Sequence, residues 1–381
     1  MAIRRHDVHV CLVSEQATPN FIPVLDARFR PREVILVVSA QMRERASWLK
    51  QAIEHRGVVV TEHEIEDAWD ISRAQDALLE LVAKREGADL ALNVTGGTKP
   101  MAIAAQEVFR AEKLPVFYVH PAKNQILPLF SGEPPFAIED RVGLADFLAI
   151  HGFHEVDRDR REYPESHVEY AEEFVKEVER FGDPLRTLNA LAKSAEGTLR
   201  AGLRHYGNDH RLDELLDKLT RFGLARIEKQ ELVFPDEATR FFINGGWLEM
   251  HITRVLTRCA EELGVQEHAR GLVVESVKGA RNEIDVAFLA HNRLFLVECK
   301  TKRFLEARAA HPAADGPGAE SLYKLDSLTA LGGLNTRGAL VSYQPLGKWD
   351  RQRAEDLRIR IVETGQLRNL AKHLREWVGA S

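Results

Sequence analysis

Cysteine is scarce in this sequence, which has three in 381 residues, at positions 11, 259 and 299. So few scattered thiols build neither a disulfide framework nor a zinc cluster, and this is typical of a reducing compartment. Long apolar runs are also missing, because the first one, Val8–Val13, ends at once in polar residues. The sequence therefore predicts no signal peptide, no membrane span and a cytoplasmic location.

A strong excess of one charge is missing as well, because the net charge is only −6. The charge is unevenly distributed, at −4 for residues 1–150, −6 for 151–264 and +4 for 265–381. Basic surfaces attract polyanions such as nucleic acids. The C-terminal part is thus the one expected to meet a nucleic acid, although a small excess also suits an ordinary solvated surface.

Short apolar runs alternate with helical patterns over the first 130 residues. The runs predict strands at Val8–Val13, Val34–Val38, Val58–Val60, Leu90–Val94 and Val116–Val119. The patterns between them predict helices at Gln41–His55, Ile71–Arg85 and Pro100–Glu112. Alternating β and α units indicate a parallel, doubly wound α/β sheet, which binds ligands at the carboxyl ends of its strands.

A glycine-rich loop follows the fourth predicted strand and leads into a helix. It reads Thr95-Gly96-Gly97-Thr98-Lys99-Pro100-Met101. Glycines allow close approach of a ligand, and a helix N-terminus offers free N–H groups to phosphate. The spacing matches neither a Walker A loop nor a dinucleotide fingerprint. A phosphate or nucleotide cradle is the favoured interpretation, and a simple chain reversal is the alternative.

Other polar residues are predicted at the same edge of the sheet. Three follow the first strand and one ends the second: Ser14, Gln16, Asn20 and Ser39. Together with Thr95, Gly96, Gly97, Thr98, Lys99 and Met101 they form the predicted ligand-binding set.

The middle of the chain looks like a connector. Residues 131–165 are rich in proline, glycine and charge, and helices are expected at Glu169–Phe181, Leu185–Ala195 and Leu212–Phe222. The last of these, with the segment Ala225–Phe234, resembles a winged-helix recognition helix and its wing. The segment is acidic, which favours a connector without DNA contact.

Two predicted strands after residue 280 carry the most informative pattern of the chain. A two-residue turn at His291-Asn292 pairs residues whose numbers sum to 583, which places Asp285 opposite Glu298 and Glu283 opposite Lys300. Facing carboxylates repel each other, and a divalent cation removes that repulsion. Oxygen ligands favour Mg²⁺ or Mn²⁺, and a nearby lysine can orient or deprotonate water. A solvated hairpin face is the alternative.

The elements around this hairpin suggest a mixed domain. A helix is predicted at Trp247–Leu263, a further strand at 270–277, a helix at Ala319–Thr329, a strand at Ala339–Tyr343 and a basic helical region at the end. The first of these helices carries Glu249.

In combination, the two motifs resemble a known family. The doubly wound part with its Thr95–Met101 loop is similar to a CARF domain, the sensor of CRISPR-associated proteins. Asp285, Glu298 and Lys300 resemble the PD-(D/E)xK nuclease core, although Ile284 stands where the pattern has proline. Together they resemble the CARF-nuclease effectors of type III CRISPR systems.

This resemblance implies a CARF domain at 1–145, a linker with a winged-helix-like segment at 146–240 and a restriction-endonuclease-like domain at 241–381. It implies a homodimer that binds a cyclic oligoadenylate, with cyclic tetra-adenylate expected. It also implies a Mn²⁺- or Mg²⁺-dependent nuclease acting on DNA, RNA or both.

The resemblance also assigns roles at the nuclease core. Asp285, Glu298 and the Cys299 carbonyl would be metal ligands, and Lys300 would orient water and stabilise charge. Glu249 would be a further acidic residue, while Glu283 would pair with Lys300 or bind a second metal.

Two other functions remain open from the sequence. A transcriptional regulator would use the sensor and the winged-helix-like segment, but it would leave Asp285, Glu298 and Lys300 without a purpose. A ring nuclease would degrade the cyclic ligand within the sensor pocket, which needs a geometry that sequence does not show.

Overall fold

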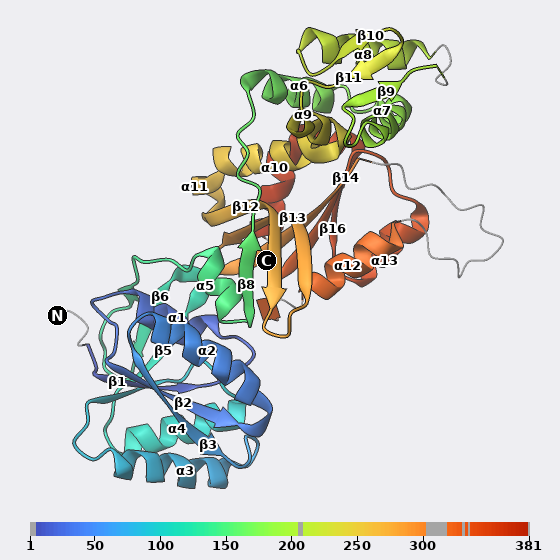
Figure 1. Ribbon diagram of the computed structural model, residues 1–381. Helices are drawn as coiled ribbons and strands as arrows, with labels where there is room; N and C mark the ends of the chain where they lie inside the picture. Colours follow the sequence, from blue (N-terminus) through green and yellow to red (C-terminus); the bar gives the residue numbers. More distant parts are fainter. Residues whose placement is uncertain (1–4, 205–208, 302–317, 330–331, 334–335, 380–381) are drawn as a thin grey trace.

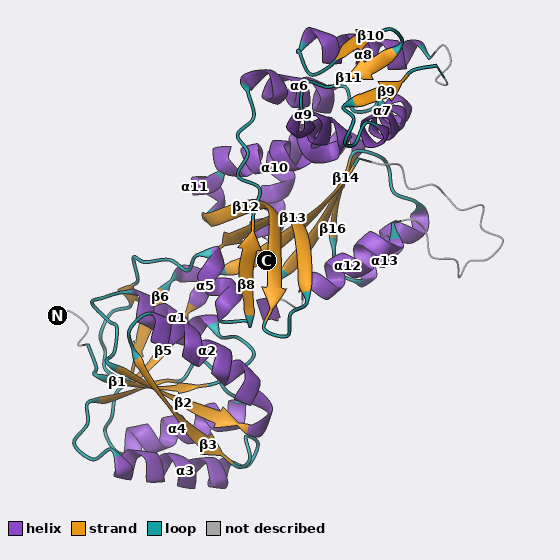
Figure 2. Ribbon diagram, in the orientation of Figure 1, coloured by secondary structure: helices purple, strands orange, loops and turns teal. Residues whose placement is uncertain are grey.

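The computed structural model describes residues 5–204, 209–301, 318–329, 332–333 and 336–379. Two sheet-based units follow each other along the chain, and a smaller, mainly helical unit packs at the far end of the second (Figure 1). Figure 2 shows that helices cover the faces of both large sheets. None of the described helices has the length and apolar character needed to cross a membrane.

The N-terminal sheet has seven strands in the order β3-β2-β1-β4-β5-β6-β7. Their bounds are β1 Val8–Leu12, β2 Glu33–Ser39, β3 Val59–Ile65, β4 Leu90–Asn93, β5 Val116–His120, β6 Gln125–Leu129 and β7 Phe136–Ala137. The first five are parallel, while β6 and β7 pair antiparallel. The parallel α/β sheet expected from the alternating pattern is confirmed.

Helices cover both faces of this sheet. They are α1 Thr18–Leu25 and α2 Arg43–His55 on one face, and α3 Ile71–Lys84 and α4 Lys99–Ala111 on the other. The sequence patterns did not predict α1, whose segment contains Pro19 and Pro23. Pro19 lies in the first helical turn, where proline is tolerated, whereas Pro23 lies inside the helix; every residue of α1 is buried. Burial therefore outweighs the weak local helix signal.

The C-terminal sheet has six strands in the order β16-β15-β14-β13-β12-β8. Their bounds are β8 Phe153–Asp157, β12 Val265–Ser276, β13 Arg281–Ala290, β14 Arg293–Lys300, β15 Arg337–Ser342 and β16 Arg360–Glu363. Helices α12 Ala319–Thr329 and α13 Lys348–Asp356 pack on one face, and α10 Trp247–Arg258 and α14 Leu370–Gly379 on the other. The short α11, Ala260–Leu263, follows α10.

Strand β8 corrects the interpretation of residues 131–165 as a linker. It pairs antiparallel with β12 and so completes the C-terminal sheet from a segment far earlier in the chain. The same stretch also contains β7 and helix α5, Leu144–Ala149. An edge strand is held mainly by backbone hydrogen bonds, so its charged sequence gave little sign of it. The predicted domain boundaries at residues 145 and 240 stay predictions.

The smaller unit contains α6 Glu165–Lys176, α7 Gly182–Ser194 and α8 His210–Arg221, with α9 Glu237–Phe241 and the helical turn η3 Phe242–Gly246 leading to α10. A three-stranded sheet, β10-β11-β9, lies beside them, formed by β9 Arg200–Gly202, β10 Arg226–Glu228 and β11 Glu231–Val233. Its apolar side chains share one hydrophobic cluster with α10, α14 and the strands of the C-terminal sheet. This unit is therefore part of the C-terminal body.

The two large units also share a hydrophobic cluster. It contains Phe21 and Leu49 from the N-terminal unit, Phe147 of α5, and Leu272 and Leu294 from the C-terminal sheet. Packed side chains are displaced together rather than singly. A movement of the N-terminal sheet can therefore reach the C-terminal one.

Candidate functional site

The strands that carry the predicted acidic site pair as the sequence predicted. The ladder between β13 and β14 runs from Ala290 opposite Arg293 to Val286 opposite Val297, which confirms the predicted register. His291 and Asn292 form the turn, both with positive φ. Asp285 and Glu298 come directly after the last ladder pair, at the end of the hairpin away from the turn.

Beyond Val286 side-chain bonds replace the ladder bonds, one between the two strands and one within β14. The Cys299 N–H donates to Asp285 Oδ2 over 2.6 Å, and Lys300 Nζ donates to Glu298 Oε1 over 2.6 Å. The Glu298 side chain is only 4% exposed, while that of Lys300 is 30% exposed. The structure thus brings Asp285, Glu298 and Lys300 together, half enclosed at one end of the sheet.

The partner of Lys300 is not Glu283, as one sequence expectation had it. Glu283 was predicted to lie opposite Lys300 and to pair with it or to bind a second metal. In the described residues Lys300 pairs with Glu298, and Glu283 is exposed. The side chain of Ile284 packs in a different cluster from that of Val286, so the strict alternation of faces breaks at Asp285.

The electrostatics of this cluster follow from its burial. Burial, followed by the charge of Glu298, raises the pKa of Asp285 to about 6, against the opposing effect of the Cys299 N–H. Burial by itself would lower the pKa of Lys300, but its bond to Glu298 and the nearby charges raise it overall. Lys300 is therefore a stable ammonium, suited to stabilise negative charge rather than to remove a proton.

Glu249 lies near this cluster, on the first turn of α10. Burial, then the charge of Asp285, raises the pKa of Glu249 to about 8. It lines an open cleft of about 570 Å³ together with Glu283, Phe241, Arg160 and others.

Lys324 of α12 belongs to the same cluster and was missed by the sequence analysis. Its Nζ donates to Glu298 Oε2 over 3.0 Å. No spacing rule links it to the hairpin, because α12 reaches the site only through packing against β14 and β15. An isolated lysine on a predicted amphipathic helix gives no local signal of such a role.

The donor set fits a divalent cation. Asp285 and Glu298 supply carboxylate oxygens whose mutual repulsion a cation would relieve, and oxygen is the ligand that Mg²⁺ and Mn²⁺ prefer. Within the described part of the chain, no group of three or more acidic, histidine or cysteine side chains is arranged to hold a metal. A cation here would need ligands from water, substrate or backbone as well, which is usual for Mg²⁺. The role of the Cys299 carbonyl stays a prediction.

The glycine-rich loop at the N-terminal sheet lies where the sequence placed it, between β4 and α4. A Cβ atom at Gly96 would lie 2.0 Å from the Leu12 carbonyl oxygen, and Gly97 has a φ of +74°. Both glycines are therefore required by the path of the chain beside β1. Lys99 is exposed on the first turn of α4, with its charge available to a ligand.

The hydroxyl groups of the loop bond to the protein itself. Thr95 Oγ1 donates to Asn93 Oδ1 and accepts from the Val119 N–H, both over 2.7 Å. Thr98 Oγ1 donates to the Ala68 carbonyl oxygen and caps α4 by accepting from the Met101 N–H. The two threonines thus hold the loop in shape.

Several other predicted ligand residues are enclosed by the fold. Asn20 is buried and donates to the Leu12 carbonyl oxygen over 2.8 Å, while Ser39 and Met101 are buried as well. Met101 packs in the core between the sheet and α3 and α4. Ser14 and Gln16 are half-buried at the edge. The ligand contacts of all these residues stay predictions.

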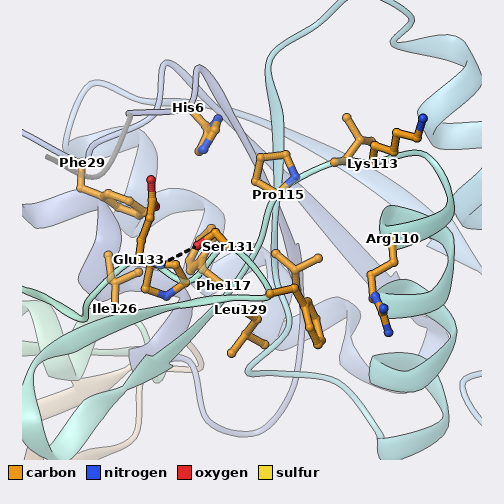
Figure 3. A pocket seen from close by; sticks show the side chains of 14 residues that line it. His6, Phe29, Arg110, Lys113, Pro115, Phe117, Ile126, Leu129, Ser131 and Glu133 are labelled. Atoms are coloured by element: carbon orange, nitrogen blue, oxygen red, sulfur yellow. Dashed lines mark hydrogen bonds between the residues drawn. The ribbon is translucent and has the colours of Figure 1, made fainter. Parts of the chain in front are cut away.

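Another cavity opens at the opposite end of the N-terminal sheet. It measures about 470 Å³ and is lined by His6, Phe29, Arg110, Lys113 and residues around the start of β5 (Figure 3). Since β5 is parallel to β4, this is the amino end of the strands. Ligands of doubly wound sheets bind at the carboxyl ends of the strands, so this cavity lies at the wrong end for a ligand site. We favour the edge that carries Lys99 as the ligand site, because the glycine-rich loop and the N-terminus of α4 lie there.

The carboxyl edge of the N-terminal sheet faces the turn of the acidic hairpin. A small cavity there is lined by Gln16, Pro121, His151, His291 and Asn292 among others. The Asn292 side-chain amide donates to the Pro121 carbonyl oxygen over 2.8 Å. The predicted ligand edge and the acidic hairpin are therefore in direct contact.

Comparisons with known proteins agree with this two-part architecture. Residues 8–147 match the family model "Card1 CARF domain", and residues 236–381 match "Card1-like, endonuclease domain". No curated protein sequence matches the chain.

Solved structures extend the likeness over the whole length. Protein VC1899 from Vibrio cholerae is 27% identical with a TM-score of 0.86, and each chain covers 98% of the other. Can2 from Sulfobacillus thermosulfidooxidans, solved with cyclic tetra-adenylate, is 28% identical with a TM-score of 0.77, over 98% of this chain and 97% of that one. A type III CRISPR defence DNA nuclease activated by cyclic oligoadenylate shares the fold at 22% identity and a TM-score of 0.52, over 89% of this chain and 45% of that one.

The parallel N-terminal sheet, the acidic hairpin of the C-terminal sheet and the matches to both domain models agree. The chain belongs to the Card1 family, with a CARF domain followed by a Card1-like endonuclease domain.

Proposed function

We propose that this protein is a metal-dependent nuclease that a cyclic oligoadenylate switches on in CRISPR-associated defence. The observation that carries the proposal is the direct contact between the two units, since Pro121 at the carboxyl edge of the CARF sheet touches Asn292 in the turn of the hairpin that bears Asp285 and Glu298. The similarity to Can2 in complex with cyclic tetra-adenylate supports that ring as the activator.

The acidic cluster supplies the chemistry of phosphodiester cleavage. Asp285 and Glu298 would hold a Mn²⁺ or Mg²⁺ ion, and such an ion would supply polarisation of the phosphate and activation of water. Lys300, held 2.6 Å from Glu298, would stabilise the negative charge that develops on the phosphate. Glu249, on the first turn of α10 beside this cluster, would be a further acidic residue of the site.

The activator would sit at the Lys99 edge. Lys99 offers a positive charge to phosphates, and the N-terminus of α4 offers N–H groups. The hydrogen bonds of Thr95 and Thr98 fix the loop that positions these groups. A cyclic ligand with internal symmetry suits two copies of the chain related by a two-fold axis. We therefore expect a homodimer with the ligand between its CARF domains.

The test is cleavage of plasmid DNA and of RNA, each with and without cyclic tetra-adenylate and Mn²⁺. Cleavage that requires both additions is expected. Full activity in excess EDTA would contradict the metal mechanism, and full activity without the ring would contradict the switch. Light scattering of the same samples measures the dimer.

A further inference from the structure

Lys324 bonds to the active-site carboxylate from a separate element of the fold. Its Nζ lies 3.0 Å from Glu298 Oε2, and the other oxygen of that carboxylate accepts from Lys300. The Lys324 side chain is 41% exposed, against 4% for Glu298. One nearly enclosed carboxylate thus carries an ammonium group on each of its oxygens.

The charges of the cluster are balanced in this arrangement. Asp285 and Glu298 supply two negative charges, while Lys300 and Lys324 supply two positive ones. A divalent cation bound to the same carboxylates would leave an excess of two positive charges if both lysines stayed in place. Like charges a few ångströms apart repel strongly in a half-buried site. One lysine must therefore leave its carboxylate partner, or an anion must bind at the site.

Lys324 is the lysine that can move away from Glu298 more easily. It stands on α12 rather than on β14 and is the more exposed of the two. Its neighbour Tyr323 is an exposed aromatic residue on the same helix, with the Arg353 guanidinium over its ring at 5.2 Å. A lysine beside an exposed ring is a combination that binds the backbone and bases of nucleic-acid strands.

We propose that Lys324 is a phosphate-binding residue of the nuclease, held by Glu298 until a cation takes its place on that carboxylate. The ammonium then turns to a phosphate of the nucleic-acid strand. Lys324 thus competes with the cation in the free protein and contributes to substrate binding in the loaded one. This inference rests on the proposed nuclease function.

The experiment compares Lys324→Met and Lys324→Arg with the wild-type protein and with Lys348→Met. Lys348 is an exposed lysine on the neighbouring α13, so its variant controls for the loss of one positive charge. Mn²⁺ binding is measured by calorimetry without nucleic acid. KM and kcat are then measured on a labelled oligonucleotide of the nucleic acid that the wild type cleaves.

Lys324→Met is expected to bind Mn²⁺ about tenfold more tightly, because the competing ammonium is gone. Its KM should rise by about tenfold with kcat within about threefold of wild type, because a phosphate contact is lost. Lys324→Arg should keep the Mn²⁺ affinity and KM within about threefold of wild type. Lys348→Met should change neither the Mn²⁺ affinity nor KM.

Unchanged or weaker Mn²⁺ binding by a folded Lys324→Met would overturn the competition. An unchanged KM would overturn the phosphate contact, and a large loss of kcat at unchanged KM would make Lys324 part of the chemical step instead. If the proposed nuclease function is wrong, the wild-type protein itself will neither bind Mn²⁺ nor cleave nucleic acid, which distinguishes this outcome from the ones above. If the methionine variant is unfolded, Lys324→Gln replaces it in the same comparison.

Discussion

The Asn292 side chain joins the acidic hairpin to the CARF domain at Pro121, over a hydrogen bond of 2.8 Å. Asn292 also accepts a hydrogen bond from Gln266 Nε2, which in turn donates to the Val142 carbonyl oxygen. Pro121 directly follows β5, so the bond starts at the predicted ligand edge of the sheet. Any shift of that edge therefore acts on the hairpin that ends in Asp285 and Glu298.

We predict that Asn292→Gly reduces activation by the cyclic ligand while preserving its binding. Glycine keeps the left-handed backbone of this turn, where φ is +58°, and removes only the side chain. Coupling energies between sites are typically about 1–3 kcal/mol, so the ratio of stimulated to basal cleavage should fall by roughly 5- to 100-fold. Cleavage rates with and without cyclic tetra-adenylate measure that ratio. His291→Gly, in the same turn, controls for the added glycine.

A normal activation ratio in a folded Asn292→Gly protein would mean that the signal passes elsewhere, for instance through the shared hydrophobic cluster at Phe147.

We predict that Asp285→Asn abolishes cleavage and raises the melting temperature of the metal-free protein at pH 8. The substitution removes a buried charge that repels Glu298, and this repulsion contributes to the raised pKa of Asp285. The amide oxygen can still accept from the Cys299 N–H. Scanning calorimetry in EDTA measures stability, and plasmid nicking measures activity. Asp326→Asn, at an exposed position of α12, should alter neither.

Residual cleavage by Asp285→Asn at wild-type level would remove Asp285 from the proposed metal site. A lower melting temperature would show that the carboxylate bond to Cys299 outweighs the repulsion.

We predict that Lys99→Ala shifts the activation curve to higher ligand concentration by about 10- to 100-fold. A charge-assisted phosphate contact is worth roughly 1.5–3 kcal/mol. The cleavage rate at saturation should stay near wild type, because the acidic cluster is untouched and a ligand acts only through its differential affinity. Titration of cyclic tetra-adenylate against nicking rate gives the curve.

Lys113→Ala is the matched control, because Lys113 lines the cavity of about 470 Å³ at the other end of the sheet. A shift in Lys113→Ala with none in Lys99→Ala would move the ligand to that cavity.

We predict that Glu249 makes the metal-free protein less stable as pH rises from 6 to 8. Its pKa is raised to about 8 in the folded protein, so over this range the folded state binds more protons than the unfolded state. The free energy of unfolding then falls with pH, by at most roughly 1.4 kcal/mol per pH unit. Glu249→Gln removes this contribution, and the difference between the two melting curves cancels the effect of the histidines.

Melting temperatures in EDTA at several pH values give both slopes. Equal slopes for wild type and Glu249→Gln would show that Glu249 is ionised across the range. Glu261→Gln, at an exposed position of α11, should keep the wild-type slope.

Local patterns in the sequence determined both main motifs. Strictly apolar runs predicted the parallel strands, because a sheet covered on both faces needs them. The turn at His291-Asn292 and the apolar strands around it were sufficient for the register that places Asp285 near Glu298. The pairing of Lys300 was only partly predictable, because the strands separate just beyond Val286 and its ammonium turns to Glu298 rather than Glu283.

Tertiary structure alone decided which distant residues join these motifs. Strand β8 is held by backbone bonds to β12, and α1 is held by burial, so neither depends on a strong local pattern. Met101 and Lys324 are both helical residues, yet packing buries one in the core and brings the other to Glu298. Local sequence sets the spacing of side chains along one element, whereas contacts between elements depend on how their apolar faces fit together.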